Sequence, residues 1–504
     1  MAQPEKCPDC RLQNLMAYRN ERSFHRRQCD KCKKNIISIF AESAPCPVYC
    51  RECWRGDGWE ALDYGRGFDF GKPFFEQYFE LMKVVPQLFM VNALGENVDY
   101  SNYGYRNKNC YLLISSDDCE DCYFGNYLWN SKNCMDCLYV TNSQVCYELT
   151  DSHNCYHCFY SDELENCNDC FFSYDLKGCQ NCVGCIGLRH KSYCWFNEQL
   201  LEEGFKAKLK DLNANDPSHW VSKLKERKGD VFHRSTTTVN CEDCLGDHIK
   251  DCKNAKFCFD SYGLEDSKFI VNGPGQIKNC YDFCGAKELE ASYQGISTGG
   301  PGINLLFNNH AWSGCANVIY GSFNVASQYL FGCAGVRHKK YCILNKQYSK
   351  EVYEELAPKI IEHMSASGEW GEFFPIRFAF FHYNETLAND LFPLDKEAVL
   401  KRGWKFREEE GVKGAPVQER VKKCADCGKN YKMIDHELHF YQNEGLAQPE
   451  KCPDCRHKIR MNKRNPYKLW KRQCGKCGTE ILSTYASQRP EKICCQQCYL
   501  SGTY

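Results

Sequence analysis

Residues 133–158 read NCMDCLYVTNSQVCYELTDSHNCYHC, and in this stretch Cys returns after a fixed interval. Extending the comparison outward gives a series of Cys residues that are each 12 positions apart: Cys110, Cys122, Cys134, Cys146, Cys158, Cys170, Cys182 and Cys194. Aromatic and β-branched residues lie between them, and Ser, Asp, Asn and Gly mark the turns. A short period of this kind is typical of a β-solenoid, in which equivalent positions stack about 4.8 Å apart. We therefore predict a mainly β fold with ladders of Cys.

The period leaves the length of one coil open, because a coil could hold one Cys of the series or two. Tyr, Phe and Trp are frequent in this region and need a wider interior than a coil with a single Cys of the series provides. We therefore expect a coil of about 24 residues, so that residues 99–194 make about four coils that rise about 19 Å. The alternative, a coil of half that length, would rise about 38 Å over the same stretch.

A duplicated segment predicts a second solenoid unit. Residues 184–194 match residues 332–342 at an offset of 148. Each copy is followed by a stretch rich in Lys, Glu and Leu, at 198–227 and 347–365, which predicts an exposed amphipathic helix. The Cys residues between 241 and 342 keep no strict spacing. The prediction of a second solenoid therefore depends on the match of residues 332–342 to the end of the first one.

The same zinc-type module stands at both ends of the chain. Residues 2–11 (AQPEKCPDCR) reappear unchanged as residues 447–456, an offset of 445. The C-terminal copy contains four C-x-x-C pairs, whose thiolates fill two tetrahedral sites: Cys424, Cys427, Cys452, Cys455, Cys474, Cys477, Cys495 and Cys498. The pairs could combine sequentially or in an interleaved, cross-braced order, and spacing alone leaves both open.

The N-terminal copy departs from this pattern. One complete four-thiolate site can form from Cys29, Cys32, Cys50 and Cys53. Cys7 and Cys10 make only half of another site, because their partner pair would lie before residue 1. Either the natural start lies upstream, or another ligand such as Cys46 or His25 completes the site.

The segment 424–456 resembles the bacterial probable zinc-ribbon family. Its motifs are CADCGK at 424–429, ELHFY at 437–441 and PEKCPDCR at 449–456. That family has the same order of C-x-x-C-G, E-x-x-F-Y and P-x-x-C-P-x-C-R, and the resemblance implies sequential pairing for the first C-terminal site. The whole chain is similar to uncharacterised Cys-rich zinc-binding proteins of candidate-phylum bacteria, in which zinc modules flank a repeat region.

We expect about three to four structural zinc ions, held in zinc-ribbon or treble-clef modules. A site closed by four thiolates has no open position, so it does not activate water. We interpret the solenoid Cys residues as buried free thiols, since Cys packs as a small apolar residue. Additional zinc at pairs such as Cys119/Cys122 and Cys155/Cys158 is the alternative, although it would add negative charge to an acidic segment.

Charge is strongly asymmetric although the net charge is −1. Residues 451–476 hold ten Lys or Arg against one acid, and residues 110–185 hold twelve Asp or Glu against two Lys. Arg and Lys neutralise phosphates and Trp can stack on unpaired bases, so we expect nucleic-acid binding, preferably to RNA or single strands. The candidate residues, which we call the basic face, are Arg456, Lys458, Arg460, Lys463, Arg464, Trp470, Lys471, Arg472, Arg26 and Arg27.

Two other functions stay open. In the first, the protein is an interaction scaffold whose basic modules dock on the acidic solenoid of the same or another chain. In the second, it is a β-helix enzyme that acts on polysaccharide, with a role for the repeated R-H-K at 189–191 and 337–339. We interpret these triplets as turn residues at a coil end, and no phosphate loop, nucleophile elbow or H-E-x-x-H is present. We therefore expect a non-catalytic protein.

The remaining features place the modules in the chain and in the cell. No secretory signal and no long apolar run is visible, so we expect no membrane span and a reducing, cytoplasmic setting. Residues 73–85 predict a helix that caps an open solenoid end. The expected domains are an N-terminal zinc module (1–60), a helical cap (61–97), two solenoid units with their helices (98–230 and 231–365), a connector (366–420) and a tandem zinc module (421–504).

Overall fold

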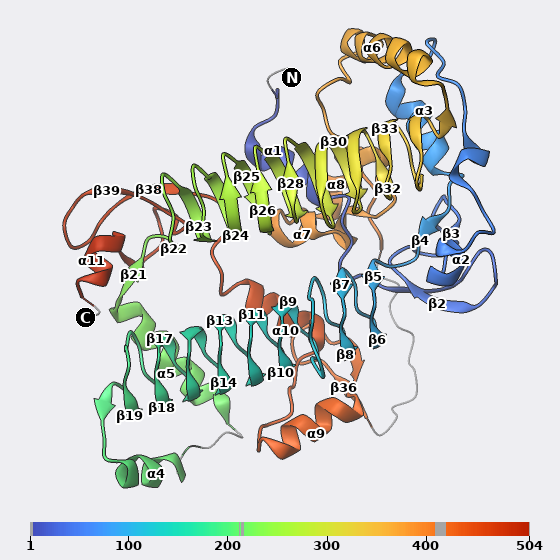
Figure 1. The fold of residues 1–504 in the computed structure, drawn as a ribbon. Helices are drawn as coiled ribbons and strands as arrows, with labels where there is room; N and C mark the ends of the chain where they lie inside the picture. The colour runs from blue at the N-terminus through green and yellow to red at the C-terminus, as the bar shows by residue number, and fades with distance from the viewer. Residues whose placement is uncertain (1–3, 211, 213–215, 409–419, 503–504) are drawn as a thin grey trace. The chain divides into compact units, whose positions relative to one another are not determined.

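The computed structural model describes residues 4–210, 212, 216–408 and 420–502. The chain forms two compact units, and each joins segments that are distant in sequence. Unit 1 contains Met1–Met90, Thr236–Glu408 and Tyr467–Leu469, and unit 2 contains Val91–Ser235, Glu409–Pro466 and Trp470–Tyr504. Unit 1 therefore combines the N-terminal module with the second solenoid, and unit 2 combines the first solenoid with the C-terminal module (Figure 1).

The first solenoid is built from two parallel sheets in unit 2. One sheet contains β10 (Lys132–Met135), β12 (Gln144–Tyr147), β14 (Tyr156–Phe159), β16 (Asn168–Phe171), β18 (Gln180–Val183), β19 (Ser192–Trp195) and the antiparallel β20 (Glu198–Gln199). The other contains β9 (Asn126–Trp129), β11 (Leu138–Thr141), β13 (Thr150–His153), β15 (Asp162–Glu165) and β17 (Tyr174–Lys177). Before them, β5 (Asn92–Ala93) pairs with β7 (Gly104–Tyr105), and β6 (Glu96–Asp99) pairs with β8 (Lys108–Tyr111).

Each coil of this solenoid corresponds to a single period of the Cys series. Neighbouring strands pair at that offset, as Cys134 with Cys146 in one sheet and Leu138 with Thr150 in the other. The β-solenoid is confirmed, and the expected coil of about 24 residues is wrong.

A left-handed residue at every third position bends the chain into this narrow coil. Asn133, Asp136, Tyr139 and Asn142 have φ angles between 50° and 54°. The residue after each of them is small and buried: Cys134, Cys137, Val140 and Ser143. Asn and Asp tolerate the left-handed conformation better than most residues. The coil therefore has four short sides around a narrow core of Cys, Ser and aliphatic side chains.

The aromatic residues, which suggested a wide coil, lie on its outside. Tyr147, Phe159 and Phe171 follow the inward-facing Cys residues directly and form a column along the solenoid. They are buried because they pack in one cluster with Tyr431 and Tyr441 of the C-terminal module. The coil can stay narrow since a separate module, and not the solenoid interior, covers the aromatic rings.

The solenoid Cys residues form ladders of free thiols, which are buried except at Cys241 and Cys244. All 39 Cys of the chain are free. Their Sγ–H groups donate to backbone carbonyls, for example Cys134 to Lys132 at 3.4 Å. Burial raises the pKa of the Cys110 thiol to about 12, so the neutral thiol is favoured. Among the described residues, no cluster of metal-ligating groups includes a solenoid Cys.

The second solenoid, in unit 1, has coils of varying length. Its strands are β22 (Thr238–Val239), β23 (Leu245–Lys250), β24 (Lys256–Glu265), β25 (Lys268–Val271), β26 (Pro274–Lys278), β27 (Tyr281–Ala286), β28 (Leu289–Glu290), β29 (Tyr293–Thr298), β30 (Gly302–Ala311), β31 (Cys315–Ile319), β32 (Ser322–Asn324), β33 (Gln328–Phe331), β34 (Lys340–Ile343) and β35 (Lys346–Gln347). Leu330 pairs with Val318 at the offset of the Cys series, whereas the pair Leu245–Lys256 is one position closer and the pair Lys268–Tyr281 one position farther apart. Single-residue insertions and deletions therefore explain why the Cys spacing is irregular here.

Helices pack against both solenoids, mostly on their sides, and the short η1 (Ala61–Tyr64) packs against the last coil of the second one. In unit 2 the helices are α4 (Glu202–Lys210) and α5 (Pro217–Asp230), and in unit 1 they are η1 together with α3 (Phe74–Met82), α6 (Lys350–Ala366), α7 (Leu387–Leu391), α8 (Lys396–Lys401) and the short η2 (Ile376–Phe378) and η3 (Tyr383–Glu385). The predicted helix at 73–85 is α3, but it does not cap an open end. Its Phe74 ring lies 5.0 Å from Tyr320 and 5.4 Å from Phe331, on the side of the last coils. None of the helices in the described residues is both long and apolar enough to cross a membrane.

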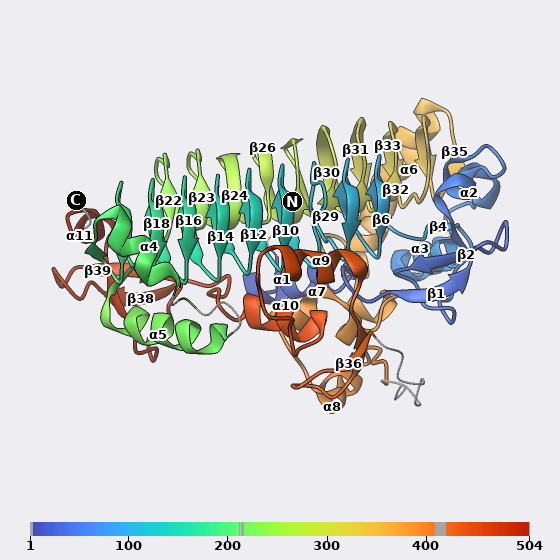
Figure 2. The ribbon, with the colours of Figure 1, turned by 90° about the horizontal axis from the view of Figure 1, so that it is seen from below.

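The terminal modules consist of short hairpins and short helices. The N-terminal one contains α1 (Pro8–Met16), β1 (His25–Gln28), β2 (Asn35–Ser38), β3 (Val48–Tyr49) and α2 (Arg51–Arg55), with β3 paired to β4 (Gln87–Leu88). The C-terminal one contains β36 (Val421–Lys423), β37 (Asn430–Lys432), α9 (Asp435–Asn443), α10 (Pro453–Met461), β38 (Trp470–Gln473), β39 (Glu480–Ser483), β40 (Lys492–Cys494) and α11 (Gln496–Leu500), with β40 paired to β21 (Phe232–Arg234). Figure 2 shows α9 and α10 alongside the first solenoid.

Candidate metal centres

Three clusters of four thiols lie in the terminal modules. They are Cys29, Cys32, Cys50 and Cys53; Cys424, Cys427, Cys452 and Cys455; and Cys474, Cys477, Cys495 and Cys498. Within each cluster all four sulfur atoms lie within 4.8 Å of one another. The C-terminal pairs thus combine sequentially, and the interleaved order is excluded.

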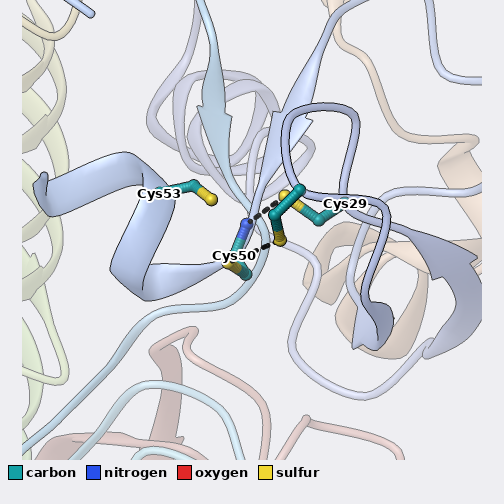
Figure 3. A group of neighbouring side chains, drawn as sticks. Cys29, Cys50 and Cys53 are labelled. Atoms are coloured by element: carbon teal, nitrogen blue, oxygen red, sulfur yellow. Dashed lines mark hydrogen bonds between the residues drawn. The ribbon is translucent and has the colours of Figure 1, made fainter. Parts of the chain in front are cut away.

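Each cluster joins a hairpin turn to the N-terminus of a helix. Cys424 and Cys427 lie in the turn between β36 and β37, while Cys452 is the N-cap of α10. The backbone N–H of Cys452 donates to Cys424 Sγ at 3.2 Å. The equivalent bonds run from Cys495 to Cys474 and from Cys50 to Cys29, both at 3.3 Å (Figure 3).

The local electrostatics favour a thiolate in each cluster. Burial raises the pKa of the Cys424 thiol, but backbone N–H groups of Cys427, Cys452 and Asp426 outweigh it and lower the pKa to about 6. The same causes lower the pKa of Cys474 to about 6 and that of Cys29 to about 7. Because metals bind the thiolate, these clusters suit a soft or borderline divalent metal ion in a tetrahedral site. Such a site has no open position, so its chemistry is structural.

Cys7 and Cys10 are exposed and belong to no such cluster among the described residues. The proposed completion by Cys46 or His25 is wrong. Cys46 is buried with Ile39 and Val48, and burial raises the pKa of its thiol to about 12. His25 Nε2 lies 3.0 Å from a carboxylate oxygen of Glu385.

Several arginines of the basic face form ion pairs within unit 2. Arg456 and Arg460 lie on α10, Arg464 follows that helix, and the three contact acidic residues of the first solenoid. Asp136 accepts Arg460 at 2.7 Å and Arg456 at 3.2 Å. Arg464 lies 3.0 Å from Asp151 and stacks over an aromatic ring of the solenoid. The structure therefore corrects our placement of these arginines on a free surface, because their side chains are buried in the solenoid contact.

The other residues of the basic face divide into two groups. Lys463 contacts Asp162 at 3.2 Å, Arg472 donates to the Ala486 carbonyl at 2.7 Å, and the buried Arg27 contacts Asp30 at 2.8 Å. Lys458, Lys471 and Arg26 are exposed, and Trp470 is partly exposed. Lys463 is exposed as well although it contacts Asp162, so the second group and Lys463 could meet a nucleic acid without rearrangement.

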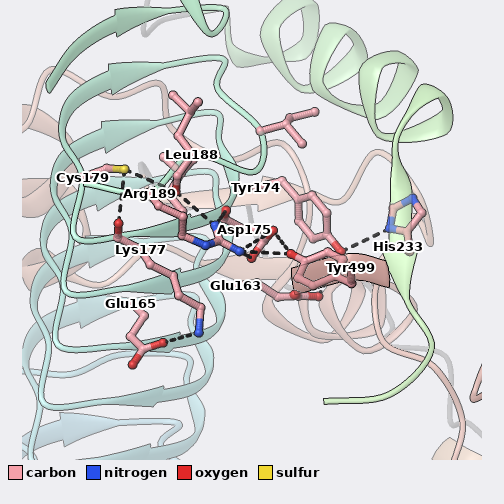
Figure 4. Close-up of polar contacts among 12 residues, drawn as sticks. Glu163, Glu165, Tyr174, Asp175, Lys177, Cys179, Leu188, Arg189, His233 and Tyr499 are labelled. Atoms are coloured by element: carbon pink, nitrogen blue, oxygen red, sulfur yellow. Dashed lines mark hydrogen bonds and ion pairs between the residues drawn. The ribbon is translucent and has the colours of Figure 1, made fainter. Parts of the chain in front are cut away.

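In each unit, the arginine of the R-H-K triplet contacts the helix that carries two ligands of a four-thiol cluster, α11 in unit 2 and α2 in unit 1. In unit 2, Arg189 lies 2.9 Å from Asp175 and donates to the Tyr499 hydroxyl at 3.1 Å (Figure 4). In unit 1, the Arg337 guanidinium lies 4.3 Å from the centre of the Trp54 ring. Sequence reasoning interpreted the triplets as turns and missed this role. The signal was present, since the arginines are 148 positions apart and Trp54 and Tyr499 are 445 apart, the offsets of the two duplications.

Helices α1 and α10 dock on their solenoids in the same way. Arg11 of α1 lies 2.9 Å from Asp282 of the second solenoid, as Arg456 of α10 contacts Asp136 of the first. Arg11 also stacks over Phe269 at 5.1 Å, and Arg456 stacks over a Phe ring of its own solenoid at 4.7 Å. The two units thus repeat one arrangement of solenoid and module.

Fold and sites together define a mainly β protein, in which four-cysteine modules of zinc-ribbon-like form dock on β-solenoids. Comparison with models of protein families and with curated proteins found no match to this chain.

Proposed function

We propose that the three four-thiol clusters bind zinc and that the metal holds the terminal modules in their folded form. Four thiolates in a tetrahedral arrangement are the usual ligand set of structural zinc, which contributes folding free energy directly. The modules have small cores of their own, so folding depends on the metal. We place the protein in a reducing compartment such as the cytoplasm, because all of its Cys residues are free.

We further propose that the protein is a non-catalytic scaffold in which zinc-held helices support two solenoids. One observation carries this proposal: Arg456, Arg460 and Asp136 form an ion-pair group whose side chains are at most 4 % exposed. Charges are removed from water at this depth only when they are paired, so the contact depends on both partners. The helix that presents the two arginines begins at the zinc ligand Cys452.

The sides of the first solenoid that the module leaves free are polar and regular. Stacked side chains form ladders there, such as Asn130 to Asn142 at 2.7 Å and Asn154 to Asn166 at 2.6 Å. An exposed ion pair between an Arg and an Asp of neighbouring coils continues the pattern. A rigid, regular surface of this kind suits a binding partner that is itself a protein, which is the role we propose for the scaffold.

Substitution of a single zinc ligand tests whether the zinc-held helix supports the solenoid. In Cys427→Ser, we expect hydrogen exchange to accelerate at least tenfold in the coils that α10 covers, around 123–171, because the docking helix loses its anchor. The matched variant Cys32→Ser should accelerate exchange in unit 1 and leave residues 123–171 unchanged. Unchanged exchange in both variants would contradict the scaffold.

Nucleic-acid binding is a second candidate function. It is favoured by Lys458, Lys471 and Arg26, which stay exposed on the modules. If it is correct, the affinity for a single-stranded RNA should fall steeply between about 50 and 200 mM salt, and Lys458→Ala with Lys471→Ala should reduce the salt slope by about 1 to 2. Absence of binding even at low salt would rule it out.

A further inference from the structure

Cys7 and Cys10 form an exposed thiol pair at the start of α1. Cys7 is the N-cap of the helix, with φ −62° and ψ 159°. Cys452, the N-cap of α10, has φ −65° and ψ 160°. The surrounding sequence is identical at the two positions, and at α10 the pair Cys452 and Cys455 belongs to a complete cluster of four thiols. The first pair therefore has the sequence and backbone of a metal-binding half-site.

The two helices also occupy equivalent positions on their solenoids. Asp136 follows Met135, which lies five coils before Trp195 along the strand pairing. Asp282 follows Tyr281, which lies five coils before Ile343. Trp195 and Ile343 correspond at the offset of 148. The Arg residues that bind the two Asp residues are thus anchored at the same point of the two solenoids.

The two helices differ in the residues that pack around their N-termini. In unit 2, the turn that carries Cys424 and Cys427 completes the metal cluster, and Met135 is fully buried in the same apolar group. In unit 1, no third ligand joins Cys7 and Cys10 among the described residues. The Tyr side chain that corresponds to Met135 is 39 % exposed there. Unit 1 therefore presents half of a metal site, and the aromatic ring that takes the place of Met135 stays partly exposed under Lys268.

We propose that Cys7 and Cys10 bind one zinc ion together with Cys7 and Cys10 of a second copy of this chain. This inference rests on the proposed zinc binding of the complete clusters. Two copies related by a two-fold axis supply four thiolates, the number that a tetrahedral site needs, without any other partner. Two helix N-termini then face the negatively charged site, which stabilises the thiolates. The two copies of Tyr281 lie near the contact and lose exposed apolar surface.

Zinc content and mass in solution test this site together. We expect the full chain, kept in a phosphine reductant, to be a dimer with about 3.5 zinc ions per chain by mass spectrometry and light scattering. Cys7→Ser with Cys10→Ser should be a monomer with about 3.0 zinc ions per chain. Cys241→Ser with Cys244→Ser removes another partly exposed C-x-x-C pair that belongs to no cluster among the described residues, and should stay a dimer with about 3.5.

Alkylation of the unmodified chain provides a readout that does not depend on a variant. Cys7 and Cys10 should be protected in the zinc-loaded dimer and react once a chelator separates the copies. A monomer with about 3.0 zinc ions and reactive Cys7 and Cys10 would overturn the proposal while leaving the complete clusters intact. A dimer that survives Cys7→Ser with Cys10→Ser would also overturn it. Near-zero zinc in every variant would instead refute the metal binding on which it rests.

Discussion

At the scale of residues, buried ion pairs determine how the modules are held. Asp136 is fully buried and contacts two arginines of α10. The sequence showed the acidic and basic segments but gave no means to pair Asp136 with Arg456, because they are 320 positions apart. The metal ligands were predictable residue by residue, since C-x-x-C turns carry their own geometry. Docking contacts have no such local signature.

Asp136→Ala should destabilise unit 2 strongly. The change removes the buried counter-ion that Arg456 and Arg460 share and leaves each with one other carboxylate, Glu437 or Glu148. Breaking a buried ion pair typically costs about 3 to 5 kcal/mol. The free energy of unfolding of unit 2, from urea denaturation, measures the effect. Asp118→Ala removes the exposed pair with Arg106 and should cost less than about 1 kcal/mol. Equal effects of the two changes would refute the role of Asp136.

Substitutions of the inward-facing Cys146 test whether the interior of the coil is narrow. Cys146→Ser should be tolerated, at a cost of about 1 kcal/mol, because Ser143 and Ser131 fill inward positions of the same solenoid. Cys146→Phe should cost about 3 kcal/mol or more, since the narrow interior has no room for a ring. Thermal unfolding of both variants measures this difference. A stable Cys146→Phe protein would favour the wider coil.

At the scale of elements, the 12-residue period of Cys was visible in the sequence. The finer period, in which every third residue faces inward, was not recognised. Small residues recur at every third position, as in Cys134, Cys137, Val140 and Ser143. This pattern alone indicates four short sides around a narrow core. The abundance of aromatic residues misled the choice of coil, because their burial under α9 and α10 depends on a module at the other end of the chain.

Arg189→Ala should loosen the last module of the chain. Arg189 contacts both the buried Asp175 and the Tyr499 hydroxyl, which also donates to Asp175 directly. Loss of Arg189 leaves the Asp175 carboxylate buried without its cation, so hydrogen exchange in β40 and α11 should become faster by an amount that corresponds to about 3 kcal/mol. Lys177→Ala is the matched change on the neighbouring coil, where the partner is the part-exposed Glu165 at 2.7 Å (Figure 4). It should alter exchange by less than about 1 kcal/mol. The reverse order of effects would contradict the assigned contact.

At the scale of the whole molecule, the chain contains one arrangement twice. In each unit the module contacts the solenoid at two points. One is an Arg–Asp ion pair, and the other is the arginine of the R-H-K triplet. Both duplications were visible in the sequence. That the N-terminal module belongs with the second solenoid was not, because repeat offsets relate copies to each other and do not say which parts pack together.

The central claim is that sulfur atoms from separated C-x-x-C turns converge on common metal ions. X-ray absorption at the zinc edge of the purified full chain tests it most directly. We expect each zinc to have four sulfur neighbours at about 2.3 Å and no nitrogen or oxygen neighbour in the first shell. Zinc bound mainly by nitrogen or oxygen, or Cys residues of the three clusters joined as disulfides, would contradict the account.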